Sequence, residues 1–228
     1  MIIHKNSEKI LICLPTFHSD LSWLKRAIDS VANQTHIFFD CYIVKDSCTK
    51  AKIPCLECDN CNESINYCNL ICSKDKRFKF FNLPLNCGAA GWGPRNFAIM
   101  NTSHNLIAYL DDDNWYEPNH LELLIKSIKE NNSDMAYTGT KIINTENKVI
   151  HKRIHSHAPK EGHIDTSEIL HKRILIQKYG GWRWVKKGND WDIVSRWENL
   201  RWSHTNEITV NFYLRENCGI HRENFIND

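Results

Sequence analysis

The sequence predicts an α/β protein with a mostly parallel sheet and helices on both faces. In the first half of the chain, short apolar runs alternate with segments of helical periodicity, which is typical of parallel strands joined by helices. One apolar run, residues 105–110, has the length and composition of a buried strand and ends abruptly in Asp111, Asp112 and Asp113. A chain of 228 residues is long enough for one such domain, and we expect it to span residues 1–228.

The first two strands and the helix between them are the clearest elements. Ile10–Leu14 is continuously apolar, as expected of a central parallel strand, and the segment 15–17 ends it. Asp20 is a suitable N-cap for a helix from Leu21 to about Asn33. Phe38–Val44 then predicts a second strand. If these two strands are parallel, the helix crosses over between them with a right hand.

The remaining elements follow from apolar periodicity, prolines and turn residues. In the first half we expect a strand at Arg77–Leu83, a loop at Asn86–Gly93, a helix from Pro94 to about Asn101, the strand before the aspartates, a helix that starts at Glu117–Pro118, and a strand at Asp134–Thr138. In the second half we expect a hairpin of Lys141–Ile143 and Lys148–His151, a loop at His151–Glu161, a short helix within Ile169–Tyr179, a helix at Asp190–Arg201, and a final strand at Ile208–Leu214.

The three adjacent aspartates indicate a cation site. They follow a predicted strand, and ligands of open α/β sheets bind at the carboxyl edge of the strands. Neighbouring carboxylates repel one another, and oxygen ligands favour a hard divalent ion such as Mg2+ or Mn2+ over zinc. A solvated turn that caps the next helix is the alternative.

Composition excludes several classes of protein. The net charge is +2, so bulk electrostatics do not predict a nucleic-acid partner. No apolar run approaches the roughly 20 residues that a membrane span needs. Because residues 1–9 also lack the apolar core of a signal peptide, we expect a cytoplasmic protein. Its ten cysteines are then expected to be reduced thiols or metal ligands rather than disulfides.

The segment 48–76 is unusually rich in cysteine and reads as an insertion, where we would otherwise expect only a short helix. Cys55, Cys58 and Cys61 are spaced by two residues each, and Cys68 and Cys72 follow. This spacing is compatible with a structural zinc ion in the segment Cys55–Cys72, although it is not a clean pair of C-x2-C knuckles. Unliganded thiols in a surface insertion are the alternative.

Five motifs follow one another along the chain: I-C-L-P-T-F, V-A-N-Q-T, N-C-G-A-A-G-W-G-P-R-N, Y-L-D-D-D-N-W-Y-E-P and G-N-D-W-D. Taken together and in this order, they resemble the family 2 glycosyltransferases, which have the nucleotide-sugar-binding GT-A fold. The resemblance runs from Ile10 to about Trp202. The family implies an inverting transfer from a nucleotide-sugar donor, usually with Mn2+ or Mg2+. The aspartates then correspond to its D-x-D motif, with Asp111 and Asp113 on the metal.

The resemblance also implies the catalytic base. An inverting single displacement needs a group that takes the proton of the acceptor hydroxyl. Asp190 in G-N-D-W-D matches the family's base, with Asn189 where many relatives carry Glu. Asp192 is a second candidate. Asp190 is also a suitable helix N-cap, and capping is compatible with catalysis.

The donor-binding residues are implied in the same way. Pro15, Thr16 and Phe17 match the loop that holds the base of the nucleotide, where Phe17 can stack on it. Asp46 matches an acid that accepts a hydrogen bond from the base, although Lys45 replaces the acid that usually precedes it. Arg95 stands at a helix start, where it can pair with pyrophosphate. The donor-binding set that the resemblance implies is Pro15, Thr16, Phe17, Asp46, Arg95, Asp111 and Asp112.

The acceptor side is less well defined. We expect residues 8–139 to form the nucleotide-sugar half and residues 140–214 the acceptor half, which takes a glycan or lipid-linked acceptor with peripheral contact to a membrane. One or two of five tryptophans are expected to line the acceptor site: Trp182, Trp184, Trp191, Trp197 and Trp202. His204 and His221 lie where related folds sometimes supply a metal ligand, but ordinary surface histidines fit as well. Two rival functions are a non-catalytic nucleotide- or sugar-binding module and a zinc-dependent interaction protein.

Overall fold

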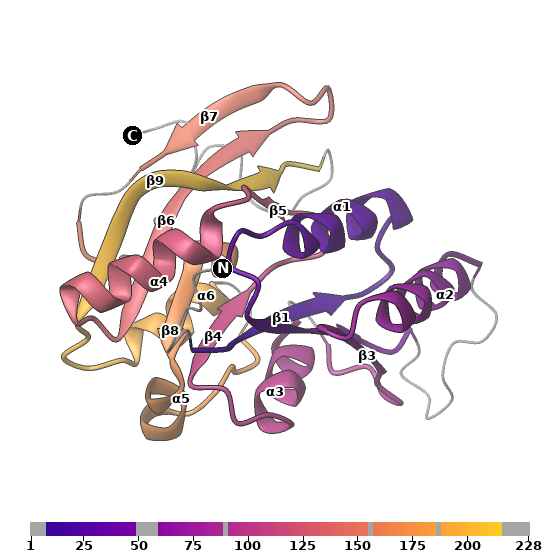
Figure 1. Cartoon of the computed structure of the whole chain (residues 1–228), viewed down its shortest axis with the longest axis horizontal. Helices are drawn as coiled ribbons and strands as arrows, with labels where there is room; N and C mark the ends of the chain where they lie inside the picture. Colours follow the sequence, from indigo (N-terminus) through magenta and orange to yellow (C-terminus); the bar gives the residue numbers. More distant parts are fainter. Residues whose placement is uncertain (1–7, 49–58, 89–90, 155–156, 186–187, 216–228) are drawn as a thin grey trace, which may run out of the picture.

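The computed structural model describes residues 8–48, 59–88, 91–154, 157–185 and 188–215 (Figure 1). Its centre is a nine-stranded sheet in the order β3-β2-β1-β4-β8-β6-β9-β5, with β7 paired to β6. The strands are β1 Ile10–Thr16, β2 Phe39–Lys45, β3 Phe78–Asn82, β4 Leu106–Tyr109, β5 Trp115–Tyr116, β6 Met135–Ile143, β7 Val149–Arg153, β8 Ile169–Lys172 and β9 Trp202–Tyr213. The helices are α1 Leu21–Ala32, α2 Asp59–Lys74, α3 Trp92–Met100, α4 His120–Asn131, α5 Arg173–Tyr179 and α6 Asn189–Ser195.

The first part of the sheet is parallel, as the alternation of elements predicted. β1 lies between β2 and β4 and pairs in parallel with both, and β3 extends the parallel set at its edge. Every residue of β1 and β2 is buried, which explains why both strands are almost continuously apolar. The α/β class and the central position of the first strand are therefore confirmed.

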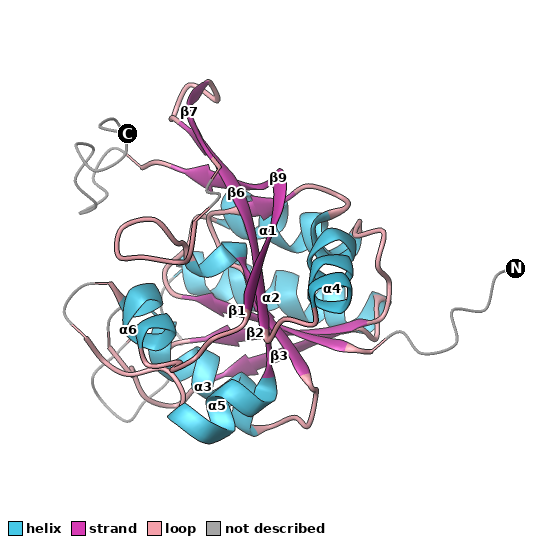
Figure 2. Cartoon of the chain, turned by 90° about the vertical axis from the view of Figure 1, so that its left-hand side faces the viewer, coloured by secondary structure: helices cyan, strands magenta, loops and turns pink. Residues whose placement is uncertain are grey.

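Helices cover both faces of this sheet, and the two faces form separate apolar cores (Figures 1 and 2). Ile10, Ile12 and Leu14 point to the face covered by α1, α2 and α4. Leu11 and Cys13 point to the face covered by α3, α5 and α6. Successive residues of a strand alternate between faces, so one apolar run supplies both cores.

The second half of the sheet contains antiparallel strands. β8 lies between β4 and β6 and is antiparallel to both, while β9 runs parallel to β6 and antiparallel to β5. The expected hairpin is confirmed as the antiparallel pair β6–β7. The sheet thus changes from parallel to mixed at β4, the strand that leads into the aspartates.

Several element boundaries differ from the sequence-based expectation. Ile169–Lys172 is a strand that is directly followed by α5. The sequence did not predict this strand, because four residues are too few to show the periodicity of a strand. β9 begins at Trp202, earlier than the expected start at Ile208, and the sequence did not show this because the first half of the strand is polar and partly exposed. The helix expected from Glu117–Pro118 begins only at His120. α2 is a 16-residue helix, longer than expected of the cysteine-rich segment.

Within the described ranges, no helix has the length and apolar character needed to span a bilayer.

Candidate active site

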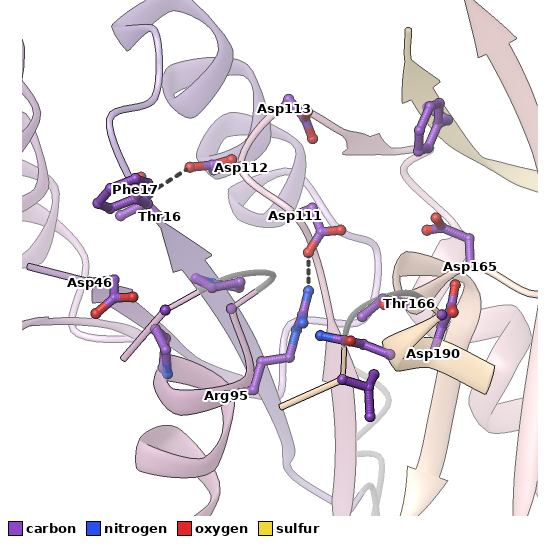
Figure 3. A pocket seen from close by; sticks show the side chains of 18 of the residues that line it. Thr16, Phe17, Asp46, Arg95, Asp111, Asp112, Asp113, Asp165, Thr166 and Asp190 are labelled. Atoms are coloured by element: carbon purple, nitrogen blue, oxygen red, sulfur yellow. Dashed lines mark hydrogen bonds and ion pairs between the residues drawn. The ribbon is translucent and has the colours of Figure 1, made fainter. Parts of the chain in front are cut away.

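A cavity of about 610 Å3 opens at the carboxyl edge of β1, β2 and β4, between the glycine loop before α3 and the start of α6 (Figure 3). Parallel strands end at the same edge of a sheet, so the segments that follow them converge there. All nine site residues singled out from the sequence line this cavity: Pro15, Thr16, Phe17, Asp46, Arg95, Asp111, Asp112, Asp113 and Asp190.

Buried Asn114 holds the acidic turn that follows β4. Its Nδ2 donates to Ser167 Oγ at 3.2 Å, and its Oδ1 accepts from the backbone N–H of Tyr213 at 3.1 Å. Asn114 is 1% exposed, so both contacts are shielded from water. The turn is thereby attached to β9 and to the short 3-10 helix η2, Thr166–Glu168. Sequence reasoning missed Asn114, because an asparagine after three aspartates reads as a turn residue.

The three aspartates point in different directions, and each has an N–H partner (Figure 3). Asp111 Oδ1 accepts from Arg95 Nη2 at 2.5 Å. Asp112 turns away toward β1 and accepts from the backbone N–H of Phe17 at 3.3 Å. Asp113 Oδ2 accepts from Arg215 Nε at 2.7 Å. The aspartates are therefore fixed in the wall of the cavity by these hydrogen bonds. The alternative, a turn that caps the next helix, is wrong, because the N-cap of α4 is Asn119.

Burial and mutual repulsion raise the pKa of these carboxyl groups. The pKa of Asp112 rises to about 6, chiefly because the group is buried and then because Asp113 is close. Burial, followed by repulsion from Asp111, also raises the pKa of Asp113, and Arg215 opposes the shift. Six aspartates and two arginines line the cavity, a surplus of four acidic groups. Such a cavity attracts cations and repels a bare anion.

The end of β1 and the loop that follows it form one wall of the cavity. Pro15 and Thr16 are buried, whereas Phe17 is 49% exposed. The backbone of Phe17 is fixed by its hydrogen bond to Asp112. An exposed aromatic ring on a fixed backbone is a suitable platform for stacking a flat ligand group.

Asp46 follows β2 and supports the glycine loop as well as lining the cavity. Its Oδ1 accepts from the backbone N–H groups of Cys87 at 2.8 Å and Ser47 at 3.0 Å. Burial raises its pKa, and the two N–H donors oppose this rise. The neighbouring Lys45 donates to the backbone carbonyl of Asp46 and to the sulfur of Cys48.

Arg95 and the glycine loop form the next wall. Gly91 is the N-cap of α3 and has a φ of 68°, a conformation that favours glycine. A Cβ at Gly91 would lie 3.1 Å from the Pro15 side chain and 3.4 Å from Arg95 Cζ. The guanidinium of Arg95 packs 4.6 Å from the ring centroid of Trp182. Arg95 is thus held rigidly with Nη2 on Asp111.

Asp190 lies across the cavity from Asp111, in the first turn of α6 (Figure 3). Its Oδ1 accepts from the backbone N–H of Trp191 at 2.8 Å. Burial raises its pKa, while Arg95 and Arg153 oppose the rise. The N-cap of α6 is Gly188 rather than Asp190, so the expected capping role is wrong.

Asp192, the second candidate for the base, does not line the cavity. Its Oδ2 pairs with Arg196 Nη2 at 3.1 Å, one helical turn further along the chain. Arg196 in turn donates to the backbone carbonyls of Tyr179 and Gly181. Asp192 therefore serves the attachment of α6 to the segment after α5.

Asp165 is a further carboxyl group in the cavity, beside Asp190 (Figure 3). Its side chain accepts from the backbone N–H of Ser167 at 2.8 Å and so caps η2. Burial, followed by repulsion from Asp111, Glu168 and Asp190, raises its pKa to about 8. Sequence reasoning placed Asp165 in the acceptor half but did not include it in the site.

Arg215 is another site residue that sequence reasoning missed. It follows β9 in a segment that reads as a polar tail, and no motif marks it. The register of β9 beside β6 and β5 brings it to Asp113. The site thus takes residues from segments that flank almost every strand of the sheet.

The expected acceptor tryptophans are mostly elsewhere. None of the five lines the cavity. Trp182 and Trp197 are buried in the core, and Trp191 and Trp202 pack against it. Trp184 is 63% exposed and lies near Gly88, where a Cβ would be 4.0 Å from its ring.

Of the two candidate histidine ligands, the one that the structure describes is not at the acidic cluster. His204 is half-buried, its Nδ1 lies 3.3 Å from Asn206 Oδ1, and its ring packs on Tyr137. It does not line the cavity. His221 lies outside the described residues.

The cysteine-rich segment is only partly described. Cys55 and Cys58 lie outside the described residues. The sequence spacing suggested that Cys61 clusters with Cys68 and Cys72, but in the structure it does not. Cys68 is fully buried in the core and Cys72 packs against that core, because both lie on the face of α2 that covers the sheet. Cys61 instead lies 2.8 Å from Cys48 and 3.8 Å from His18, a residue that the spacing could not reveal.

The fold is shared with glycosyltransferases of known structure and is the GT-A fold. A crystal structure of S. aureus TarS matches with a TM-score of 0.68 at 16% identity, covering 91% of this chain and 60% of that one. A TarS structure in complex with UDP matches with a TM-score of 0.69 at 15% identity, covering 90% and 60%. The family model for glycosyl transferase family 2 matches residues 11–188, and the chain belongs to this family.

Curated relatives are named as glycosyltransferases. An uncharacterized glycosyltransferase of Rickettsia conorii is 32% identical over 151 residues, which are 66% of this chain and 22% of that protein. The O-antigen biosynthesis glycosyltransferase WbnJ of Escherichia coli is 23% identical over 199 residues, 82% of this chain and 73% of that protein. The chain therefore spans about a fifth of the length of its Rickettsia relative.

Proposed function

We propose that this chain transfers a sugar from a nucleotide-sugar donor to a hydroxyl group of a glycan or a lipid-linked acceptor, with inversion at the sugar. One observation carries the proposal. The cavity holds Asp111 and Asp113 on one wall and Asp190 on another. The group that binds the metal and the group that takes the proton of the acceptor hydroxyl are therefore in separate places. The UDP and UDP-GlcNAc complexes of TarS support a nucleotide-sugar donor.

A divalent ion such as Mn2+ or Mg2+ fits Asp111 and Asp113. Both carboxylates face a cavity with a surplus of four acidic groups, and both are oxygen ligands of the kind such ions prefer. A donor diphosphate is itself an anion, so it needs a cation to enter such a cavity. When bound, the ion would neutralise the charge of the departing nucleoside diphosphate.

The residues on the sheet side of the cavity suit the rest of the donor. The exposed ring of Phe17 can stack on the base, above the buried Pro15 and Thr16. Asp46 can accept from the base through the oxygen that its backbone donors leave open. Arg95 is held at the start of α3 by its contact with Asp111, where its guanidinium can also pair with pyrophosphate. Asp112 positions this wall through the Phe17 backbone.

Asp190 is the base in this proposal. It takes the proton of the acceptor hydroxyl while that oxygen bonds to the anomeric carbon and the bond from that carbon to the diphosphate oxygen breaks. Burial raises the pKa of Asp190, which makes it a stronger proton acceptor in its ionised form. Asp165, with a pKa of about 8, keeps its proton at neutral pH and can donate a hydrogen bond to the acceptor.

The acceptor class rests on the relatives. WbnJ is named for O-antigen biosynthesis, which supports a cell-surface glycan or its lipid-linked precursor as the acceptor. Such a reaction fits a cytoplasmic enzyme that meets a membrane at its surface, without nucleic acid as a partner. A non-catalytic binding module is the rival, and the joint presence of Asp111, Asp113 and Asp190 in one cavity argues against it.

A donor screen with a metal-site variant tests the proposal. The parent should hydrolyse one or a few of a panel of nucleotide sugars only when Mn2+ or Mg2+ is present. Asp113→Asn keeps the size of the side chain and should abolish both hydrolysis and metal-dependent binding of the nucleoside diphosphate. Calorimetric binding of the nucleoside diphosphate to Asp113→Asn at the parental affinity would contradict the metal assignment.

A further inference from the structure

A histidine and two cysteines meet outside the donor cavity, where β1, β2 and α2 come together. His18 lies in the loop after β1, Cys48 lies just after β2, and Cys61 lies in the first turn of α2. One ligand atom from each lies within 4.8 Å of the other two. The two sulfur atoms are 2.8 Å apart, and Cys61 Sγ is 3.8 Å from His18 Nδ1. Three soft ligands from three separate elements thus converge on one point.

Buried Lys45 lies beside this cluster. Its side chain is 3% exposed, and its ammonium lies 3.2 Å from Cys48 Sγ and 3.3 Å from the backbone carbonyl of Asp46. No carboxylate among the described residues forms an ion pair with it. A cysteine sulfur bound to a metal carries negative charge, which is the kind of partner that a buried ammonium favours.

A disulfide between Cys48 and Cys61 explains these contacts less well than a metal. Disulfide sulfurs carry no charge, so a disulfide would give the Lys45 ammonium no anionic partner, and it would not use the His18 imidazole that lies 3.8 Å from Cys61 Sγ. Two thiolates and an imidazole match the ligand preferences of zinc. The same sulfur ligands are unsuited to Mg2+ or Mn2+, so this cluster is distinct from the acidic site.

The backbone of His18 also shows that its position is enforced. Its φ is 47°, in the left-handed region that a non-glycine residue rarely adopts. A residue keeps such a conformation where its surroundings hold it. The side chain is exposed, so packing in the core does not account for it.

We propose that His18, Cys48 and Cys61 form a structural zinc site that fixes the loop after β1 to the start of α2. Structural zinc sites have four ligands, of which these residues supply three. His18 directly follows Phe17, whose ring lines the donor cavity and whose backbone binds Asp112. The zinc ion would therefore hold the base-binding wall of the cavity from outside.

Metal content tests the site without any donor or acceptor, so its outcome does not depend on transferase activity. The purified chain should hold about one zinc ion that survives dialysis, measured by mass spectrometry of the metal. Cobalt in its place should give the absorption bands of a tetrahedral thiolate complex. Cys48→Ser and Cys61→Ser should lose the ion, whereas Cys72→Ser, the same change further along α2, should retain it.

His18→Asn addresses the risk that the cysteine variants fail to fold. Asparagine tolerates a positive φ and His18 is exposed, so the variant should fold while losing the imidazole. Its zinc affinity, measured by competition with a chromogenic chelator, should fall by about a hundredfold or more. Parental affinity in His18→Asn overturns the proposal. So does a zinc-free parent whose non-reduced peptide map contains a Cys48–Cys61 disulfide.

Discussion

Arg215 donates from both Nε and Nη2 to a single oxygen, Oδ2 of Asp113, across 102 positions in the sequence. Arg215 also packs over the ring of Trp23, with its Cζ 5.0 Å from the ring centroid. The carboxylate proposed as a metal ligand is thus compensated by a cation of the protein itself. Arginine and metal ion compete for the same oxygen, and this competition can be measured.

The first prediction follows from that competition. Arg215→Ala should bind Mn2+ about two- to fivefold more tightly than the parent in the absence of nucleotide, because an exposed ion pair is worth up to about 1 kcal/mol. Manganese titration followed by electron paramagnetic resonance measures this. Arg201→Ala is the matched control, since it removes an exposed arginine from Asp134, and neither of these residues lines the cavity. Equal or weaker Mn2+ binding by Arg215→Ala would show that the two cations do not compete.

The second prediction separates the two candidate bases. Asp190→Asn should lower turnover by about two to four orders of magnitude, the usual loss for a positioned general base. Its donor affinity and stability should change little, because asparagine can still accept from the backbone of Trp191. Asp192→Asn should remain active, since Asp192 pairs with Arg196 outside the cavity. Steady-state kinetics of the two variants show which aspartate is the base, and an active Asp190→Asn variant would refute the assignment of Asp190.

The third prediction concerns Asp165 and the dependence of stability on pH. Its pKa is about 8 in the folded chain, above the ordinary value of 3.8, so the folded state binds the proton more tightly. The resulting stabilisation is complete below about pH 4 and is lost as the pH rises to about 8, at up to about 1.4 kcal/mol per pH unit. Asp165→Asn should remove this decline, so its stability relative to the parent should increase across that window.

Denaturant unfolding at several pH values measures this effect. Asp134→Asn provides a control of opposite sign, because Arg201 and Lys172 hold the pKa of Asp134 below its ordinary value. The stability deficit of that variant relative to the parent should develop as the pH rises to about 4 and should then stay constant from pH 4 to pH 8. A stability difference for Asp165→Asn that stays constant from pH 4 to pH 8 would contradict the raised pKa.

The fourth prediction distinguishes a binding tryptophan from a core tryptophan. Trp184 is 63% exposed, so Trp184→Ala should change the free energy of unfolding by no more than about 0.5 kcal/mol. It should raise KM for the acceptor, because an exposed aromatic face beside the cavity can stack on a sugar. Trp197→Ala, a change in the core, should cost about 3–5 kcal/mol of stability. An unchanged acceptor KM in Trp184→Ala would leave that tryptophan without a role in binding.

The sequence predicted the parallel half of the fold and the cavity at its edge. Buried parallel strands are continuously apolar, and the residues that follow them fall at one edge by topology. β1, β2 and the aspartates after β4 therefore came directly from the sequence. The two-residue strand β5 and the four-residue strand β8 did not, because strands so short show no periodicity.

The parts of the site that sequence reasoning missed depend on pairings between distant segments. Arg215 reaches Asp113 only through the register of β9, and no local signal encodes that register. His18 meets Cys61 across 43 positions, so cysteine spacing alone pointed to Cys68 and Cys72 instead. In both cases the residue type was visible, but its partner was set by tertiary structure.

The position of β9 has a consequence for synthesis of the protein. β9 is the last of the described strands in sequence order, yet it lies between β6 and β5, and it is the only described strand that pairs with β5. The side chain of Asn114, next to the aspartates, accepts a hydrogen bond from the backbone N–H of Tyr213, which is 99 positions later in the sequence. A chain emerging from the ribosome can thus assemble its parallel strands early. Its acidic turn acquires a fixed shape only after translation has passed β9, so the site matures after the parallel strands have formed.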